Sequence, residues 1–149
     1  MIYVDTSVLV AALTREPASE RTQAWMSDQD AGVLAISHWT RVEFAAALRF
    51  KLATDQIDQG QRAAATTQFA EIASYGLTLW LPEAEDFEEA ARLAASDALA
   101  LRGPDALHFA MAWRRGAALC TLDNGLRHAC DVFGHPAVRP WTHPAADRS

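Results

Sequence analysis

The sequence has two cysteines and a single lysine among its 149 residues, and it contains no long apolar run. Cys120 and Cys130 lack the spacing of a metal-binding motif, so we expect two buried thiols and no disulfide. No stretch approaches the roughly 18 apolar residues that a membrane-spanning helix needs. Residues 1–5 show no basic segment followed by an apolar run. We therefore expect a cytoplasmic protein without a membrane partner.

The sequence also lacks an excess of positive charge, because its formal net charge is −6 at pH 7. An acidic protein is poorly suited to hold nucleic acid through phosphate contacts alone. The balance still permits a nuclease whose acids gather around a cation. Half of the residues are hydrophobic and 21% are charged, which is typical of an ordinary globular domain of this length.

Short apolar runs alternate with longer segments of helical spacing along the chain. The runs predict strands at 2–4, 33–36, 78–81, 117–122 and 138–141. The helical segments are 7–14, 18–28, 38–53, 56–75, 83–101, 105–115 and 124–131. Apolar strands separated by helices favour a parallel sheet covered on both faces. We predict one three-layer α/β/α domain over residues 1–141, with four to five parallel strands, and a flexible tail at 142–149.

Several residues mark where the predicted helices begin. Ser37 is suited to cap the helix that starts near His38, and Pro82 separates the third strand from the next helix. Glu83, Glu85 and Asp86 then follow, and we interpret them as favourable charges at a helix N-terminus.

Asp5 and Asp123 both come directly after predicted strands. Asp5 follows the first strand, and ligands of open parallel sheets bind at the carboxyl ends of strands. An N-cap of the next helix is an equally good interpretation of Asp5. Asp123 precedes Asn124 and Gly125, which favour a turn, so a turn or cap residue is also possible there.

Glu43 and Asp105 lie within predicted helices. Glu43 shares a helix face with apolar neighbours such as Ala46 and Phe50, and a carboxylate there is costly unless a cation meets it. Arg41 or Arg49 is a structural alternative for that cation. Asp105 follows Pro104 and also suits the first turn of a helix.

The four acids carry more information together than singly. In a right-handed βαβ arrangement, Asp5, Glu43, Asp105 and Asp123 are expected at one edge of the sheet. Converging carboxylates repel one another unless they are protonated or bind a hard cation, and oxygen ligands favour Mg²⁺ or Mn²⁺ over zinc. Such a site suits phosphodiester hydrolysis by a metal-activated water.

The sequence resembles the PIN-domain ribonucleases, and among them the VapC-like toxins of toxin–antitoxin pairs. Four stretches carry the resemblance, in family order: residues 1–10, 37–45, 101–110 and 119–126. It implies a parallel sheet between helices and a Mg²⁺- or Mn²⁺-dependent endoribonuclease activity. It also implies that the acidic quartet comprises Asp5, Glu43, Asp105 and Asp123, supported by the hydroxyls of Thr6 and Thr121.

The resemblance further implies an RNA substrate, an inhibitory antitoxin and a homodimer. Apolar surface on the 38–53 and 56–75 segments is our candidate for the dimer contact. Asn124-Gly125 departs from the family, where a charged residue commonly follows the last acid.

His108 lies one helical turn after Asp105, among apolar neighbours, so we favour a packed or supporting histidine over a general base. We assign the tryptophans at 25, 39, 80 and 113 to the core or an interface. A phosphatase that forms an aspartyl-phosphate needs a second acid where Ser7 stands, and no glycine-rich loop for a dinucleotide follows the first strand. The remaining alternative is a PIN-like scaffold that binds RNA or protein without cleaving it.

Overall fold

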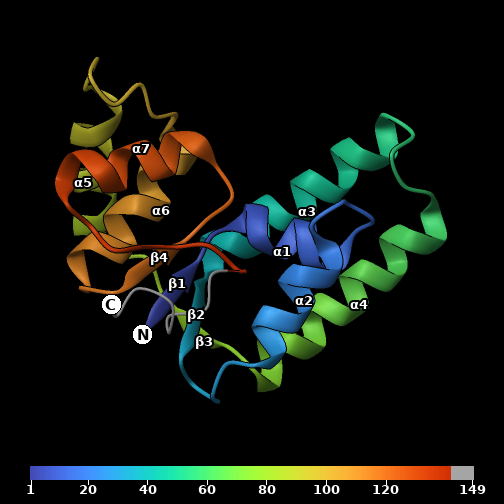
Figure 1. The fold of residues 1–149 in the computed structure, drawn as a ribbon. Coiled ribbons are helices and arrows are strands. Elements are labelled where there is room, and N and C mark those ends of the chain that lie inside the picture. The colour runs from blue at the N-terminus through green and yellow to red at the C-terminus, as the bar shows by residue number, and fades with distance from the viewer. Residues whose placement is uncertain (142–149) are drawn as a thin grey trace.

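A computed structural model describes residues 1–141 of the chain (Figure 1). The strands are β1 (Ile2–Val4), β2 (Leu34–Ser37), β3 (Thr78–Trp80), β4 (Ala118–Cys120) and β5 (Ala137–Val138). The helices are α1 (Thr6–Leu13), α2 (Ser19–Ser27), α3 (His38–Ala53), α4 (Gln59–Tyr75), α5 (Ala84–Ala94), α6 (Gly103–Arg114) and α7 (Asn124–Phe133). The predicted flexible tail at 142–149 lies outside the described residues.

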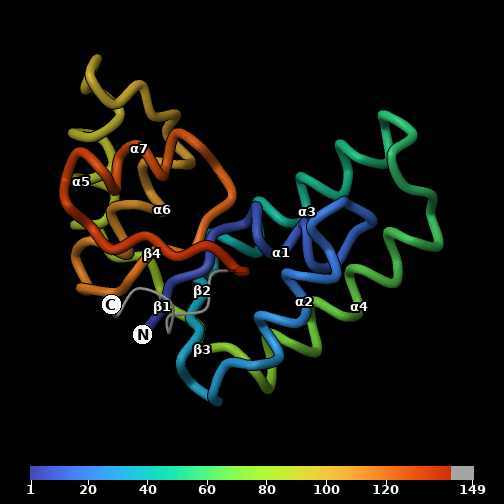
Figure 2. The backbone as a smooth tube through the Cα atoms, viewed as in Figure 1, coloured from blue at the N-terminus to red at the C-terminus, as the bar shows by residue number. Residues whose placement is uncertain are grey.

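The strands form one parallel sheet in the order β3-β2-β1-β4-β5. β1 lies at its centre, where Tyr3 pairs with Ala35 of β2 and Leu119 of β4. Helices α1 to α4 cover one face, and α5 to α7 cover the other (Figures 1 and 2). The predicted three-layer α/β/α fold with a parallel sheet is thus confirmed.

Two apolar cores lie on the two faces of the sheet. Successive strand residues point to opposite faces, so Tyr3 packs in the core under α5 to α7, whereas Val4 packs in the core under α1 to α4. The second core also contains Phe44 of α3, which is 2% exposed. Burying a side chain of this size stabilises the fold by about 1.5–3 kcal/mol.

Ser37 caps α3 as predicted. Its hydroxyl accepts a hydrogen bond from the Thr40 backbone nitrogen at 3.3 Å, and its own nitrogen donates to Thr40 Oγ1 at 3.2 Å. This reciprocal capping fixes the start of α3 directly after β2. It therefore sets which residues of α3 face the end of the sheet.

Three predicted boundaries were wrong by three residues or more. Helix α4 starts at Gln59 and not at 56, because Asp58 caps it by accepting from the Gln61 nitrogen at 2.7 Å. Helix α5 ends at Ala94 and not at 101, and the segment that follows includes Ala100 at a φ of 49°. The last strand covers 137–138 and not 138–141, since pairing to β4 ends there.

Both cysteines are free and buried, as expected from their spacing. Burial raises the pKa of the Cys130 thiol to about 11 and that of Cys120 still further above its ordinary value. Among residues 1–141, no helix combines the length and the apolar character that crossing a membrane requires.

Asp86 does more than place a charge at the start of α5. Its side chain is fully buried, accepts from the Glu83 nitrogen at 2.8 Å and forms ion pairs with Arg114 and Arg115. Burial alone raises the pKa of Asp86, but the contacts from Arg115, Glu83 and Arg114 lower it overall. The earlier interpretation as a simple helix-end charge was incomplete, because the arginines come from the far end of α6.

We predict that Asp86→Ala lowers the free energy of unfolding by about 3 kcal/mol, because Arg114 and Arg115 lose their buried acidic partner and keep only the exposed Glu83. Because the folded pKa of Asp86 is lowered, its contribution is present above pH 3.8 and disappears as the pH falls through the folded pKa. Urea unfolding at several pH values measures this.

The matched control is Glu89→Ala, which removes the exposed i,i+3 pair with Arg92 on the same helix. It is expected to cost less than about 1 kcal/mol. Equal losses for the two variants would contradict a structural role specific to Asp86.

Candidate active site

Asp5 lies at the carboxyl end of β1 and is only 2% exposed. Its Oδ1 accepts a hydrogen bond from the Ser7 backbone nitrogen at 2.5 Å, which makes it the N-cap of α1. Its Oδ2 accepts from the hydroxyl of Thr121, at the end of β4. The cap interpretation is therefore correct, and the carboxylate still lies at the sheet edge where a ligand binds.

Asp123 is connected to Asp5 through the same threonine. The backbone nitrogen of Asp123 donates to Thr121 Oγ1 at 2.9 Å. The Asp123 carboxylate caps α7 by accepting from the Leu126 nitrogen at 2.9 Å. Thr121, fully buried, thus holds the ends of β1 and β4 together.

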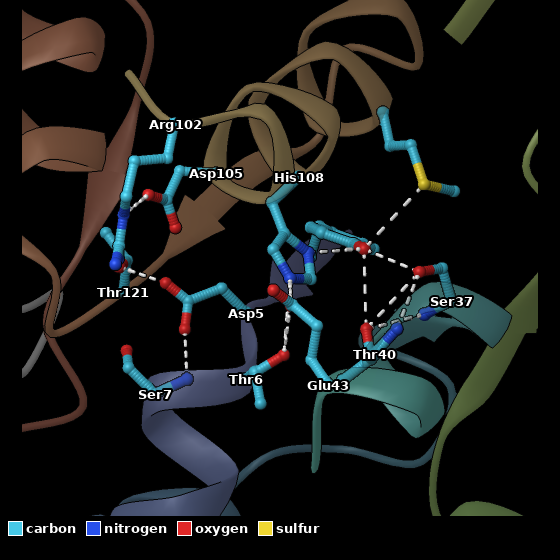
Figure 3. Close-up of polar contacts among 12 residues, drawn as sticks. Asp5, Thr6, Ser7, Ser37, Thr40, Glu43, Arg102, Asp105, His108 and Thr121 are labelled. Carbon is cyan, nitrogen blue, oxygen red and sulfur yellow. Dashed lines mark hydrogen bonds and ion pairs between the residues drawn. The ribbon is translucent and has the colours of Figure 1, made fainter. Parts of the chain in front are cut away.

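Glu43 projects from α3 toward the same edge, with its side chain 21% exposed (Figure 3). Its Oε2 accepts from Thr6 Oγ1 at 2.7 Å and contacts His108 Nε2 directly. The partners of Glu43 are thus a threonine and a histidine from other elements, and not Arg41 or Arg49, the structural alternative that the sequence left open. The sequence pattern gave no sign of this pairing, because the three residues are far apart in the chain.

His108 links Glu43 to a buried hydroxyl cluster. It is 2% exposed, and its Nδ1 lies 2.9 Å from the hydroxyl of Tyr3. The Tyr3 hydroxyl lies 2.8 Å from Ser37 Oγ in turn. A proton on Nε2 donates to Glu43 and leaves Nδ1 to accept from Tyr3. This geometry agrees with a supporting histidine, while the role of Tyr3 was missed because it sits in an apolar strand.

Asp105 lies in the first turn of α6, and its side chain is 17% exposed. Its Oδ2 accepts from Arg102 Nε at 3.0 Å. Sequence reasoning also missed Arg102, which directly precedes the helix. The spacing of three residues between the two was the available signal, since i and i+3 side chains meet at a helix start.

The environment shifts the ionisation of the carboxyl groups in different directions. Burial raises the pKa of Asp5 above its ordinary value. Burial likewise raises the pKa of Asp105; Arg102 opposes this, while the negative charges of Asp123 and Glu43 add to it. For Glu43 burial acts upward too, but His108, Thr6 and Arg102 lower the pKa overall. The charges of Glu43 and Asp123 thus act on Asp105, while Asp5 is connected to Asp123 through Thr121 at the same edge.

The donor set fits a hard divalent cation in its chemistry, because it consists of carboxylate oxygens with threonine hydroxyls nearby. Across residues 1–141, no three acidic, histidine or cysteine side chains stand close enough together to ligate one ion in this conformation. Each carboxylate instead accepts hydrogen bonds from protein donors. A nearby cation would oppose the rise in pKa that burial causes at Asp5 and Asp105.

The sequence matches a known family. The chain matches the PIN domain over residues 2–132 and therefore belongs to the PIN-domain family. This confirms the family that the four sequence stretches indicated.

Solved structures show the same fold. FitAcB from Neisseria gonorrhoeae superposes with a TM-score of 0.68 at 19% identity, covering 96% of this chain and 100% of that one. VapC20 of Mycobacterium tuberculosis, described as a sarcin–ricin loop cleaving toxin, gives 0.69 at 19% identity over 87% and 95%. VapBC2 from Rickettsia felis, bound to a promoter DNA fragment, gives 0.64 at 15% over 93% and 98%. The comparison with curated proteins gives no match.

We predict that Asp5→Asn stabilises the metal-free protein at pH 7, because an amide removes a buried negative charge and keeps the cap to Ser7. A raised folded pKa means that stability is lost as the pH rises from 3.8 through that pKa. The gain should therefore shrink as the pH falls toward 3.8.

Thermal melts in chelator measure this gain, with about 2–4 °C expected for each kcal/mol. Asp55→Asn, in the exposed turn between α3 and α4, is the control, because its φ of 56° suits asparagine as well as aspartate. A lower melting temperature for Asp5→Asn would contradict the charge argument.

Proposed function

We propose that this PIN-domain protein is a Mg²⁺- or Mn²⁺-dependent endoribonuclease and the toxin of a type II toxin–antitoxin pair. The observation that carries the proposal is the acidic edge of the parallel sheet. Thr121 connects Asp5 to Asp123 there, and the charges of Asp123 and Glu43 act on Asp105. Family membership supports a nuclease, and a relative described as cleaving the sarcin–ricin loop supports RNA as the substrate class.

In this proposal the four carboxylates hold the ion and Thr6 and Thr121 support them. A bound divalent cation supplies an activated water and neutralises charge on the phosphate. Thr121 keeps Asp5 at the end of β1 in a fixed orientation. Thr6 and His108 keep the Glu43 carboxylate charged and directed at the edge.

The antitoxin partner rests on two kinds of support. One structural neighbour is described as a toxin–antitoxin complex from Klebsiella pneumoniae, and VapC20 is described as a toxin. The acidic edge also fits a positive side chain of a partner, which can balance the carboxylates where an ion otherwise would.

Self-association belongs to the same proposal. Helix α3 exposes Val42 and Phe50 by 58% and 59%, and α4 exposes Tyr75 by 92%. Exposed apolar side chains on these two helices suit a contact between two copies of the chain.

A non-catalytic PIN-like scaffold is the second candidate. It is favoured by one observation, namely that the carboxylates are occupied by protein donors and form no ready metal group within residues 1–141. The cleavage experiment below separates the two candidates.

We predict that the purified protein cleaves single-stranded RNA with Mg²⁺ or Mn²⁺ and loses this activity in excess chelator. Asp5→Asn should lower kcat/KM by about 100-fold or more, since even outer partners of a metal site contribute 10–100-fold. Gel analysis of a labelled RNA gives both results.

Asp55→Asn again serves as the control and should cleave like the wild type. Robust cleavage in chelator would remove the metal mechanism. A wild-type protein that binds RNA but leaves it intact with either metal would establish the scaffold instead.

We also predict that an inhibitory protein encoded beside this chain's gene binds through a positive side chain at the acidic edge. Raising Mg²⁺ or Mn²⁺ should then weaken the inhibitor, and Glu43→Gln should weaken it in the absence of metal. Association should be faster at low salt, because the chain carries a net charge of −6. Surface plasmon resonance at several metal concentrations tests this. If neither the metal concentration nor Glu43→Gln alters the affinity for the inhibitor, the partner binds elsewhere on the protein.

A further inference from the structure

Arg102 lies at the start of α6 but does not stabilise that helix. It is the N-cap residue of α6, and its side chain makes no capping hydrogen bond. A cation at this end is opposed by the helix dipole, which favours negative charge there. Serine, threonine or aspartate would stabilise the helix better. The arginine therefore needs another explanation.

The side chain of Arg102 lies over the acidic edge. Its Nε donates to Asp105 Oδ2 at 3.0 Å (Figure 3). Within residues 1–141, the hydrogen bond from Nε is the one that holds the guanidinium, so its two terminal nitrogens remain available. With 80% exposure, the side chain is free to reorient.

The charge of Arg102 acts on most of the acidic quartet. The contact with Asp105 raises the pKa of Arg102 first, and the charges of Asp123 and Glu43 raise it further. Each of the other carboxylates is held by a buried or backbone donor, such as Thr121, His108 or the Leu126 nitrogen. The pair with Arg102 is the exposed one and thus the easiest to displace.

We propose that Arg102 is a substrate-binding residue that occupies the cation position of the metal-free site and pairs with an RNA phosphate once a divalent ion has taken Asp105. The proposal rests on the proposed function. A guanidinium presents two parallel donors that match phosphate oxygens. In a chain with net charge −6, such a local cation offsets the repulsion between the acidic edge and the RNA backbone.

In the first measurement, calorimetry gives the affinity of the protein for Mn²⁺ in the absence of RNA. Removing the competing cation in Arg102→Ala should tighten Mn²⁺ binding about threefold to fivefold, and Arg102→Lys should fall between this and the wild type. Arg92→Ala is the matched control, because Arg92 pairs with Glu89 at the same i,i+3 spacing and is 75% exposed. It should leave Mn²⁺ binding unchanged.

The second measurement is RNA affinity at saturating Mn²⁺, using a labelled single-stranded oligonucleotide and fluorescence anisotropy. A 2′-O-methyl oligonucleotide prevents cleavage and leaves all four carboxylates in place. With this probe Arg102→Ala should weaken binding about tenfold and reduce the slope of log affinity against log salt by about 0.7, the loss expected for one phosphate contact on a single strand. Arg102→Lys should keep the slope, because it keeps the charge.

Either measurement can overturn the proposal. If Arg102→Ala binds Mn²⁺ like Arg92→Ala, the residue does not compete for the cation position. If the salt slope is unchanged, it does not contact a phosphate. Melting curves check folding, and Arg102→Ala should melt no lower than the wild type because its native cap is unfavourable. If the wild type cleaves RNA but the Arg102 variants behave like Arg92→Ala, only the role of Arg102 is rejected. If the wild type neither binds Mn²⁺ nor cleaves RNA, the proposed function itself is rejected.

Discussion

The pairing of β1 with a parallel strand on each side is the constraint on which the rest of the structure depends. Because β2, β1 and β4 run in the same direction, their carboxyl ends meet at one edge. That edge receives Asp5 directly from β1, Thr121 directly from β4, and the capped start of α3 directly from β2. A strand reversed at any of these places would scatter the acids over two ends of the molecule.

Burial of the acids at this edge is tolerated because each carboxylate has its own hydrogen-bond donor. Asp5 accepts a hydrogen bond from Thr121. Glu43 contacts Thr6 and His108, and Asp105 accepts from Arg102. These donors differ in how firmly they are held. The threonines and the histidine are buried, whereas Arg102 is exposed. The site therefore combines buried donors, which orient the carboxylates, with one exposed arginine that a metal ion can replace. This contrast in burial links the fold to the proposed binding of metal and RNA.

The buried polar cluster behind Glu43 explains why an acidic residue is stable on a largely apolar helix face. Tyr3, Ser37 and Thr40 form a connected set of hydroxyls that continues through His108 to the carboxylate. In a low-dielectric interior such a set is favourable only when its members are satisfied. Helix α3, strand β1 and helix α6 are thereby tied together beneath the candidate active site.

The sequence alone determined the parallel three-layer fold and the cap at Ser37, and it named the candidate acids, with a cap as an open alternative for Asp5 and Asp123. It could do so because periodicity and capping are local properties of the chain. It could not determine the end of α5 at Ala94 or the ion pairs of Asp86. Nor could it reveal that Glu43 meets His108 while Arg102 meets Asp105. Local patterns state which side chains share a face of one element, whereas the partners across elements depend on how sheet register and helix packing bring distant residues together.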